Sequence, residues 1–281
     1  LYDGENNSAN PSSYKVTTET ITLKKPTKKG YTFEGWYKES SFKNQITTIP
    51  KGSKGNLTLY AKWKANKYTI RFHGNKATSG SVKEMKNLEY DMDYTLNSNK
   101  FKRKGYKFVR WSTKADGSGR KYGNREEIEN LSSKNGAVVD LYAQWSRNTY
   151  KIIYKANGGE LADGTVKKYN VDTKTFKLKT PVRYGYTFKG WYKDKKCTRR
   201  VTQVKKGTIG NLTFYAKWQI NKYKIKYNGN GATGGSMKNV TVCKYGSTYT
   251  LAKNKYKRTG YVFEGWNTKK NGKGDFYEDG E

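Results

Sequence analysis

The chain has 281 residues and a formal net charge of +34, and only 33% of its residues are apolar. No apolar run approaches the roughly 20 residues that cross a bilayer, and the abundance of Tyr over Leu and Ala disfavours a helical protein with a broad aliphatic core. The chain starts without Met and shows no signal peptide, so we expect it to be part of a longer protein.

Two aromatic motifs recur along the chain. The motif Gly-Tyr-x-Phe-x-x-Trp begins at Gly30, Gly105, Gly185 and Gly260, at spacings of 75, 80 and 75 residues. The motif Tyr-Ala-x-Trp follows the first three copies. All seven tryptophans belong to one of the two motifs, and we expect them to form the structural core of the repeats: Trp36, Trp63, Trp111, Trp145, Trp191, Trp218 and Trp266.

The repeats alternate between two types, because a shift of 155 residues aligns 26–64 with 181–219 without a gap. In chain order they are A1 (1–64), B1 (65–146), A2 (147–218) and B2 (219–281). A1 lacks the segment that matches the first strand of A2, and B2 ends before a last Tyr-Ala-x-Trp strand. The cut ends are either boundaries within a longer protein or sites of strand exchange between molecules.

Alternating side chains predict the strands of each repeat. Tyr68, Ile70 and Phe72 share one face, and the same alternation recurs in residues 150–154 and 223–227. Because the Tyr-Ala-x-Trp segment alternates too, we expect about four strands per repeat, with one buried face. A short helix is expected around residues 125–131. The predicted fold class is therefore mainly β, with a small α+β unit as the alternative.

The segment Gly-Tyr-Thr-Phe-Lys-Gly-Trp-Tyr starts at Gly185 and places Phe188 and Trp191 on opposite faces of a regular strand. A bulge at Gly190 would turn Trp191 inward, so that both rings enter the core. B1 has Arg110 where the other repeats have glycine, which leaves the existence of its bulge open.

Four residues separate each closing Trp from the next opening Tyr. The third of the four is always asparagine, at Asn66, Asn148 and Asn221, and no joint is rich in Gly, Ser or Pro. Such short and uniform joints predict a fixed angle between neighbouring repeats, and hence an elongated rod.

Few side chains suggest catalysis or metal binding. The single histidine, His73, aligns with Asn228 and is interpreted as a polar residue at a strand end. Residues 116–119 read Asp-Gly-Ser-Gly and are interpreted as a turn, because a calcium site needs several oxygen ligands. We therefore predict no catalytic residue, no metal site and no cofactor.

The two cysteines lie in different repeats. Cys197 aligns with Phe42 and Cys243 aligns with Leu88, both apolar positions. We therefore expect both cysteines to be small buried side chains without a disulfide.

Positive charge is concentrated in one repeat. A2 carries +14, whereas A1, B1 and B2 carry +6, +7 and +7. Dense positive charge attracts polyanions by releasing their counterions, although a Lys-rich face can also serve solubility alone. The excess forms a candidate polyanion-binding cluster: Lys193, Lys195, Lys196, Arg199, Arg200, Lys205 and Lys206.

Candidate partners of this cluster are teichoic acid, host glycosaminoglycan, sialylated mucin and extracellular DNA. The sequence shows no recognition helix, so we expect no sequence-specific reading of nucleic acid.

The motifs resemble the Listeria–Bacteroides repeat, or internalin B B-repeat, family. In B2 the resemblance rests on YKIKYNGNGATGGSM, YGSTYTL and GYVFEGWNTKKNGKG, and in A2 on GYTFKGWY and NLTFYAKW. It extends over nearly the whole chain. It implies tandem β-grasp-like repeats in a secreted or wall-anchored bacterial protein, without enzymatic activity.

The resulting hypothesis is an extracellular stalk or adhesin segment of a bacterial surface protein, with no membrane span in this segment. One alternative is a polyanion- or glycan-binding module whose partner is an anionic cell-wall or host-surface polymer. The other is a filament built by self-association, through strand exchange between the incomplete end repeats.

Overall fold

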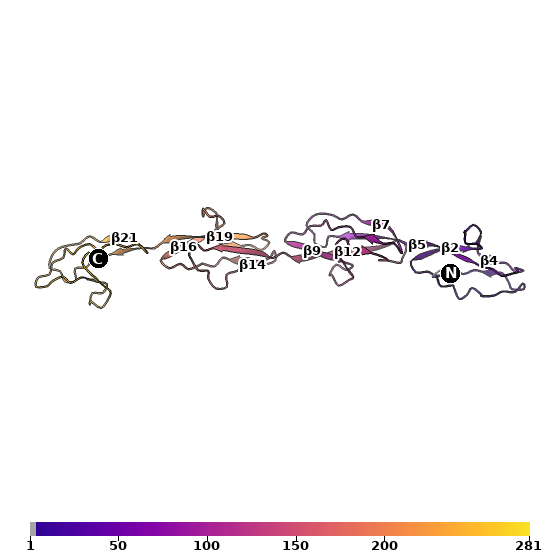
Figure 1. The fold of residues 1–281 in the computed structure, drawn as a ribbon, viewed down its shortest axis with the longest axis horizontal. Coiled ribbons are helices and arrows are strands. Elements are labelled where there is room, and N and C mark those ends of the chain that lie inside the picture. The colour runs from indigo at the N-terminus through magenta and orange to yellow at the C-terminus, as the bar shows by residue number, and fades with distance from the viewer. Residues whose placement is uncertain (1–3) are drawn as a thin grey trace. The chain divides into compact units, whose positions relative to one another are not determined.

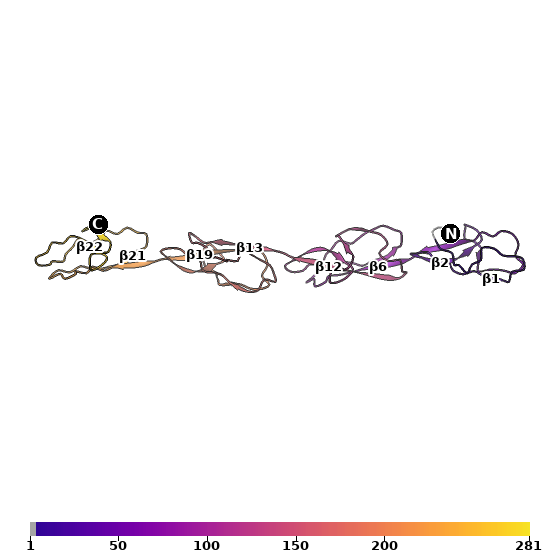
Figure 2. The same cartoon turned by 90° about the horizontal axis from the view of Figure 1, so that it is seen from below.

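The computed structural model describes residues 4–281, and these residues form strands and turns without a helix (Figure 1; Figure 2). The prediction of a mainly β protein is therefore confirmed. The chain divides into two compact units, residues 1–148 and 149–281. The first unit contains A1 and B1, and the second contains A2 and B2. The β-grasp assignment within this class stays a prediction.

B1 shows the complete sheet of a repeat. Its strand order is β10-β9-β12-β6-β7, and β12 runs parallel to β6 but antiparallel to β9. A separate ribbon pairs β8 with β11. B1 therefore has seven strands rather than the expected four. Their bounds are Lys67–His73 for β6, Met85–Glu89 for β7, Tyr94–Thr95 for β8, Tyr106–Ser112 for β9, Lys121–Tyr122 for β10, Glu127–Ile128 for β11 and Ala137–Arg147 for β12.

The helix expected around residues 125–131 is wrong. Glu127 and Ile128 instead form β11, whose partner is β8. Ile128 is 5% exposed in the core of B1, so a paired extended segment buries this side chain without a helix. Two positive backbone φ angles, 60° at Arg125 and 53° at Asn130, flank this short strand and are incompatible with a continuous helix.

A2 repeats this topology in the second unit. Its main sheet has the order β14-β13-β19-β16-β17, with β13 parallel to β19, and a ribbon pairs β15 with β18. The bounds are Tyr150–Lys155 for β13, Lys168–Tyr169 for β14, Phe176–Lys177 for β15, Tyr186–Tyr192 for β16, Arg200–Val201 for β17, Gln203–Val204 for β18 and Leu212–Ile220 for β19.

A1 has a smaller sheet, with the order β3-β2-β5, and a ribbon that pairs β1 with β4. Within residues 4–281, β5 pairs with β2 on one side only, whereas the matching β19 lies between two strands. The bounds are Ile21–Thr22 for β1, Tyr31–Tyr37 for β2, Gln45–Ile46 for β3, Thr48–Ile49 for β4 and Tyr60–Ala65 for β5.

B2 forms two separate ribbons, β20 with β21 and β22 with β23. The described part of B2 holds no closing strand to join them, and Phe263 is 38% exposed, although the matching Phe108 packs against the core of B1. The bounds are Lys222–Ile225 for β20, Val240–Lys244 for β21, Trp266–Asn267 for β22 and Phe276–Tyr277 for β23.

The cores follow the predicted alternation. In B1, the Tyr68, Ile70 and Phe72 side chains are buried together against Trp111 and Leu141. Of the seven tryptophans, Trp36, Trp111 and Trp191 are buried, and the others are half-buried at the margins of the cores. Large aromatic side chains thus supply most of the burial in repeats too small for a wide aliphatic core.

A β-bulge turns the tryptophan inward, as predicted. In A2 the register shifts between Phe188 and Gly190, and Trp191 is 2% exposed. Phe188 then contacts two indoles, with ring centroids 5.6 Å from Trp191 and 5.3 Å from Trp218. B1 keeps the same bulge with Arg110 in place of glycine. The bulge therefore belongs to the sheet register and does not require glycine.

The joint between A1 and B1 is an ordered part of the first unit. The Asn66 backbone N–H donates to the Gly30 carbonyl at 2.9 Å, and the Tyr90 N–H donates to the Asn66 carbonyl at 2.9 Å. The Asn66 side chain donates to the Ser133 carbonyl at 2.8 Å and accepts a hydrogen bond from the Thr32 hydroxyl at 2.5 Å. Gly30 has a φ of 79°, and the Tyr90 ring occupies the space that a Cβ there would need.

The joint between A2 and B2 repeats these contacts. The Asn221 N–H donates to the Gly185 carbonyl at 2.9 Å, and the Tyr245 N–H donates to the Asn221 carbonyl at 3.0 Å. The Tyr245 ring again fills the Cβ position of Gly185, whose φ is 73°. Both A–B joints are therefore fixed by backbone bonds and by a tyrosine packed on a glycine.

Candidate anion-binding site

The basic cluster of A2 begins on the turn between β16 and β17. Lys193, Lys195, Lys196, Arg199 and Arg200 all have exposed side chains there. The turn is closed by the Lys193 N–H, which donates to the Arg199 carbonyl at 2.9 Å. It therefore presents five cations on a short, hydrogen-bonded segment.

Asp194 organises this turn from within. Its carboxylate accepts hydrogen bonds from the Thr198 N–H at 3.0 Å and from the Arg199 N–H at 2.9 Å. The Thr198 bond, followed by the Arg199 bond, lowers the pKa of Asp194 below its ordinary value. Arg199 Nε lies 3.6 Å from the same carboxylate. Within residues 4–281, the other six cations of the cluster have no carboxylate within 4.0 Å.

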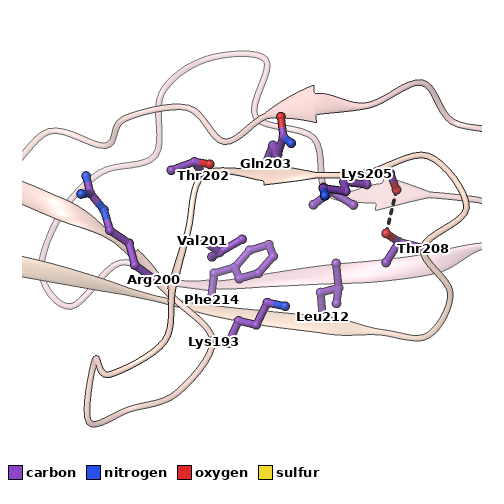
Figure 3. A pocket seen from close by; sticks show the side chains of 10 residues that line it. Lys193, Arg200, Val201, Thr202, Gln203, Lys205, Thr208, Leu212 and Phe214 are labelled. Atoms are coloured by element: carbon purple, nitrogen blue, oxygen red, sulfur yellow. Dashed lines mark hydrogen bonds between the residues drawn. The ribbon is translucent and has the colours of Figure 1, made fainter.

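The other two cations, Lys205 and Lys206, follow β18. The Thr208 hydroxyl donates to the Lys205 carbonyl at 2.7 Å, as the dashed line in Figure 3 shows. The Lys206 N–H donates to the Thr175 hydroxyl at 3.0 Å. These bonds hold the backbone of the second segment in place. The backbone that carries each of the two groups of cations is therefore fixed by hydrogen bonds.

A pocket of about 350 Å³ lies where the two segments meet (Figure 3). Three members of the cluster line it, and four others, Lys195, Lys196, Arg199 and Lys206, do not. Its complete lining consists of three cationic, three polar and four apolar residues: Lys193, Arg200, Lys205, Thr202, Gln203, Thr208, Val201, Val204, Leu212 and Phe214.

The apolar lining was missed by the charge pattern. The alternation predicted that Leu212 and Phe214 face inward, and Phe214 is indeed 1% exposed. Val204 is 4% exposed on the neighbouring ribbon. No sequence signal indicates that β17 and β19 leave a space between them, because that depends on how the short ribbon packs against the sheet.

Arg200 depends on the bulge glycine beneath it. Its guanidinium Nε lies 2.8 Å from the position that a Cβ of Gly190 would occupy, and the φ of Gly190 is 133°. In A1 the matching residues are Gly35 and Gln45, whose side chain amide crosses the glycine in the same way. The glycine therefore lets the residue at the start of the next strand lie flat across the sheet.

A1 provides an internal comparison with the same backbone. Glu39 accepts hydrogen bonds from the Lys43 and Asn44 N–H groups, at 2.9 and 2.6 Å, as Asp194 does in A2. At the positions of Lys193, Arg200 and Lys205, however, A1 has Lys38, Gln45 and Pro50. The turn is thus common to the A repeats, and the charge is particular to A2.

The cysteine prediction holds in part. Both thiols are free, and Cys243 is 0% exposed. For Cys197 the expectation of a buried side chain is wrong, because this residue is half-buried on the basic turn with a φ of 55°. The aligned Phe42 is itself 39% exposed, so an apolar residue at this position does not indicate that the position is buried in the core.

His73 forms a local polar contact in B1. A ring nitrogen lies 2.7 Å from Asp140 Oδ1, and the ring stacks on Tyr142 with centroids 4.6 Å apart. Asp140 also accepts two hydrogen bonds from Arg71, at 2.7 and 3.2 Å. The Arg71 bond comes first among the causes that lower the pKa of Asp140. This arrangement agrees with a polar residue at the end of β6.

The Asp116 carboxylate is used within its own turn, where it accepts hydrogen bonds from the Ser118 N–H at 2.9 Å and from the Ser118 hydroxyl at 2.8 Å. No group of three or more His, Cys, Asp or Glu side chains is placed to hold a metal ion within residues 4–281. The described residues also contain no helix long and apolar enough to cross a membrane.

Two proteins of Evansella cellulosilytica are similar to the chain. One, named "Putative membrane protein", is 30% identical over 91% of the chain and 37% of its own length. The other, named "Putative Gly-rich membrane protein", is 30% identical over 84% of the chain and 27% of its own length. The chain thus spans about a third of these relatives. No solved structure matches it.

The family model of the Listeria-Bacteroides repeat domain matches the chain four times, at residues 1–62, 68–144, 150–217 and 223–281. Each match contains one Gly-Tyr-x-Phe-x-x-Trp motif. The chain therefore belongs to the Listeria-Bacteroides repeat family, as an array of four tandem repeats.

Proposed function

We propose that the chain is an extracellular, non-catalytic segment of a bacterial surface protein, and that it serves as a stalk with an adhesive site for anionic polymers on A2. The membership in a repeat family and the names of the two relatives support a place at the cell envelope. The bonded A–B joints support a mechanical role, because they couple neighbouring repeats through backbone contacts.

One observation carries the adhesive part of the proposal. A1 and A2 share a hydrogen-bonded turn, yet only A2 carries seven exposed cations on that turn, on β17 and on the segment after β18. If the charge served solubility alone, it could be spread over all four repeats. Its concentration on one fixed surface favours counterion release from a bound polyanion.

The test uses the whole chain with four charge reversals, at Lys195, Lys196, Arg199 and Arg200, each changed to Glu. Retention on heparin, DNA and teichoic acid should fall, and the remaining retention should depend less steeply on salt. The matched control reverses four exposed lysines of B1 to the same net charge: Lys100, Lys102, Lys104 and Lys107. If the two variants lost retention equally, the net charge alone would explain the binding, and an adhesive site on A2 would be contradicted.

A further inference from the structure

We propose that the A2 pocket binds an acidic sugar unit of an anionic polysaccharide. The carboxylate or sulfate would lie at the cationic rim, formed by Lys193, Arg200 and Lys205, and the sugar ring on the apolar floor, formed by the apolar lining residues. This inference rests on the proposed function, since it names the ligand class of the same adhesive surface. It assigns different tasks to the cations inside the pocket and to those outside it.

The rim brings together three cations from three segments. Lys193 lies at the end of β16, Arg200 lies in β17 and Lys205 follows β18. None of the three has a carboxylate partner within 4.0 Å in the described part of the chain. An acidic group can therefore bind there without displacing an internal ion pair, and Arg200 can bind a carboxylate or sulfate through two parallel N–H bonds.

The floor distinguishes the ligand class. Val201 and Leu212 present half-buried aliphatic side chains to the pocket, and they rest on Phe214 and Val204 of the buried core, so the accessible apolar surface has a rigid base. The C–H face of a sugar ring can cover such a surface, whereas a polyphosphate chain offers only charged oxygens to it. Burial of apolar area against the floor therefore favours a glycan over polyphosphate.

The remaining lining fits the hydroxyl groups of a sugar. Thr202, Gln203 and Thr208 add polar side chains to the lining, although the Gln203 amide points away from Phe214 and Leu212 in Figure 3. The volume of about 350 Å³ lies in the range of small-ligand sites and is compatible with a short segment of a polysaccharide. Lys195, Lys196 and Lys206 lie outside the pocket, where they attract the neighbouring acidic groups of the polymer less specifically.

Two charge-matched triple variants of the whole chain test this division. The pocket variant changes Lys193, Arg200 and Lys205 to Gln, which at Arg200 recreates the glutamine of A1. The outer variant makes the same change at Lys195, Lys196 and Lys206. The probes are heparin, an unsulfated polyuronate, linear polyphosphate and single-stranded DNA, because together they separate acidic sugars from phosphate.

The two variants should weaken polyphosphate and DNA binding equally, because each loses three charges. On the acidic glycans the pocket variant should bind about tenfold more weakly than the outer variant, since a lost charge-assisted hydrogen bond costs about that factor. A neutral change, Val201→Thr, should lower glycan affinity about fourfold, as expected for one methyl group less on the floor, and leave polyphosphate binding unchanged. Circular dichroism checks that each variant is folded.

The possible results separate the two proposals. The pocket inference is wrong if the two triple variants lower the affinity for glycans and for polyphosphate by the same factors, or if Val201→Thr leaves the glycan affinity unchanged. The adhesive surface then remains as a general polyanion site. If neither triple weakens binding of any polymer, the adhesive function itself fails, and the pocket inference fails with it.

Discussion

At the scale of single residues, a comparison of equivalent positions in A1 and A2 distinguishes residues that maintain the turn from residues that supply the charge. Gln45 and Arg200 cross the same bulge glycine, so the backbone accepts either residue and the charge is a property of A2 alone. Asp194 and Glu39 both cap the turn through backbone N–H groups. The sequence shows the charge but not this capping role, which depends on a folded turn bringing the carboxylate onto amides four and five residues later.

Tyr154 gives a residue-scale prediction about pH. Burial raises the pKa of its phenol from 10.0 to about 12, so the folded state favours the neutral form. Because the folded pKa is the higher one, this stabilisation is complete below pH 10 and is lost as the pH rises towards about 12. Urea unfolding followed by A2 signals should show a smaller alkaline loss of stability in Tyr154→Phe than in the wild type.

The aligned residue in B1 is Phe72, which indicates that a phenyl ring fits this site. Tyr184→Phe is the control, because Tyr184 is 83% exposed. An identical alkaline profile for the wild type and Tyr154→Phe would show that the buried phenol has no part in the transition.

At the scale of elements, the period-two pattern predicted the first and closing strands of B1 and A2 correctly, because their side chains alternate between core and solvent. In B2 the prediction is wrong for Tyr223, which is 46% exposed. The pattern missed the two-residue strands, such as β11, since two residues are too few to establish a period. The bulge in B1 was also undecided, because Arg110 removes the glycine that signals it elsewhere. The A2 pocket was not predicted, since it arises from packing between separate segments.

The element scale also shows how the joints within each unit are built. The recurring Asn positions are visible in the sequence, but the glycine-tyrosine contact was not predicted, because it depends on Tyr90 and Tyr245 in the B repeats.

Gly185→Ala tests the joint of the second unit. It should destabilise the joint for two reasons, a positive φ of 73° and a clash with the Tyr245 ring. The φ alone costs about 1–2 kcal/mol, and the clash should add about 1–3 kcal/mol. The measurement is hydrogen exchange at the Asn221 and Tyr245 amides, which are bonded across the joint.

Gly207→Ala is the matched control, because Gly207 has a φ of 85° but nothing within 4 Å of its Cβ position. We expect it to cost only the backbone strain. Equal effects of the two substitutions on amide protection at the joint would argue against the packing of Tyr245 as a source of rigidity.

At the scale of the whole molecule, the stalk hypothesis requires the repeats to extend in line. A compact repeat of this size has a radius of gyration of roughly 11 Å, and four such repeats in line would extend for about 110–120 Å. Small-angle X-ray scattering of the chain should give a maximum dimension in this range and the profile of a rod. A compact globule or freely jointed repeats would contradict the stalk.

The adhesive site has a natural reporter in the chain. Cys197 is a half-buried thiol on the turn that carries Lys195 and Lys196, whereas Cys243 is fully buried in B2. A polymer bound to this turn should cover Cys197 and restrict the access of an alkylating reagent to its thiol. The reactivity of Cys197 should thus report occupancy of the turn.

The most direct measurement is the rate of alkylation of Cys197 in the native chain with and without a saturating acidic glycan, resolved by peptide mass spectrometry. We predict that the glycan slows alkylation of Cys197 at low salt and that high salt restores the rate, because binding depends on counterion release. Cys243 should stay unreactive throughout, which verifies that the chain remains folded. If the glycan binds but the rate at Cys197 does not change, the polymer does not cover the turn between β16 and β17, which contradicts an adhesive surface that includes Lys195, Lys196 and Arg199.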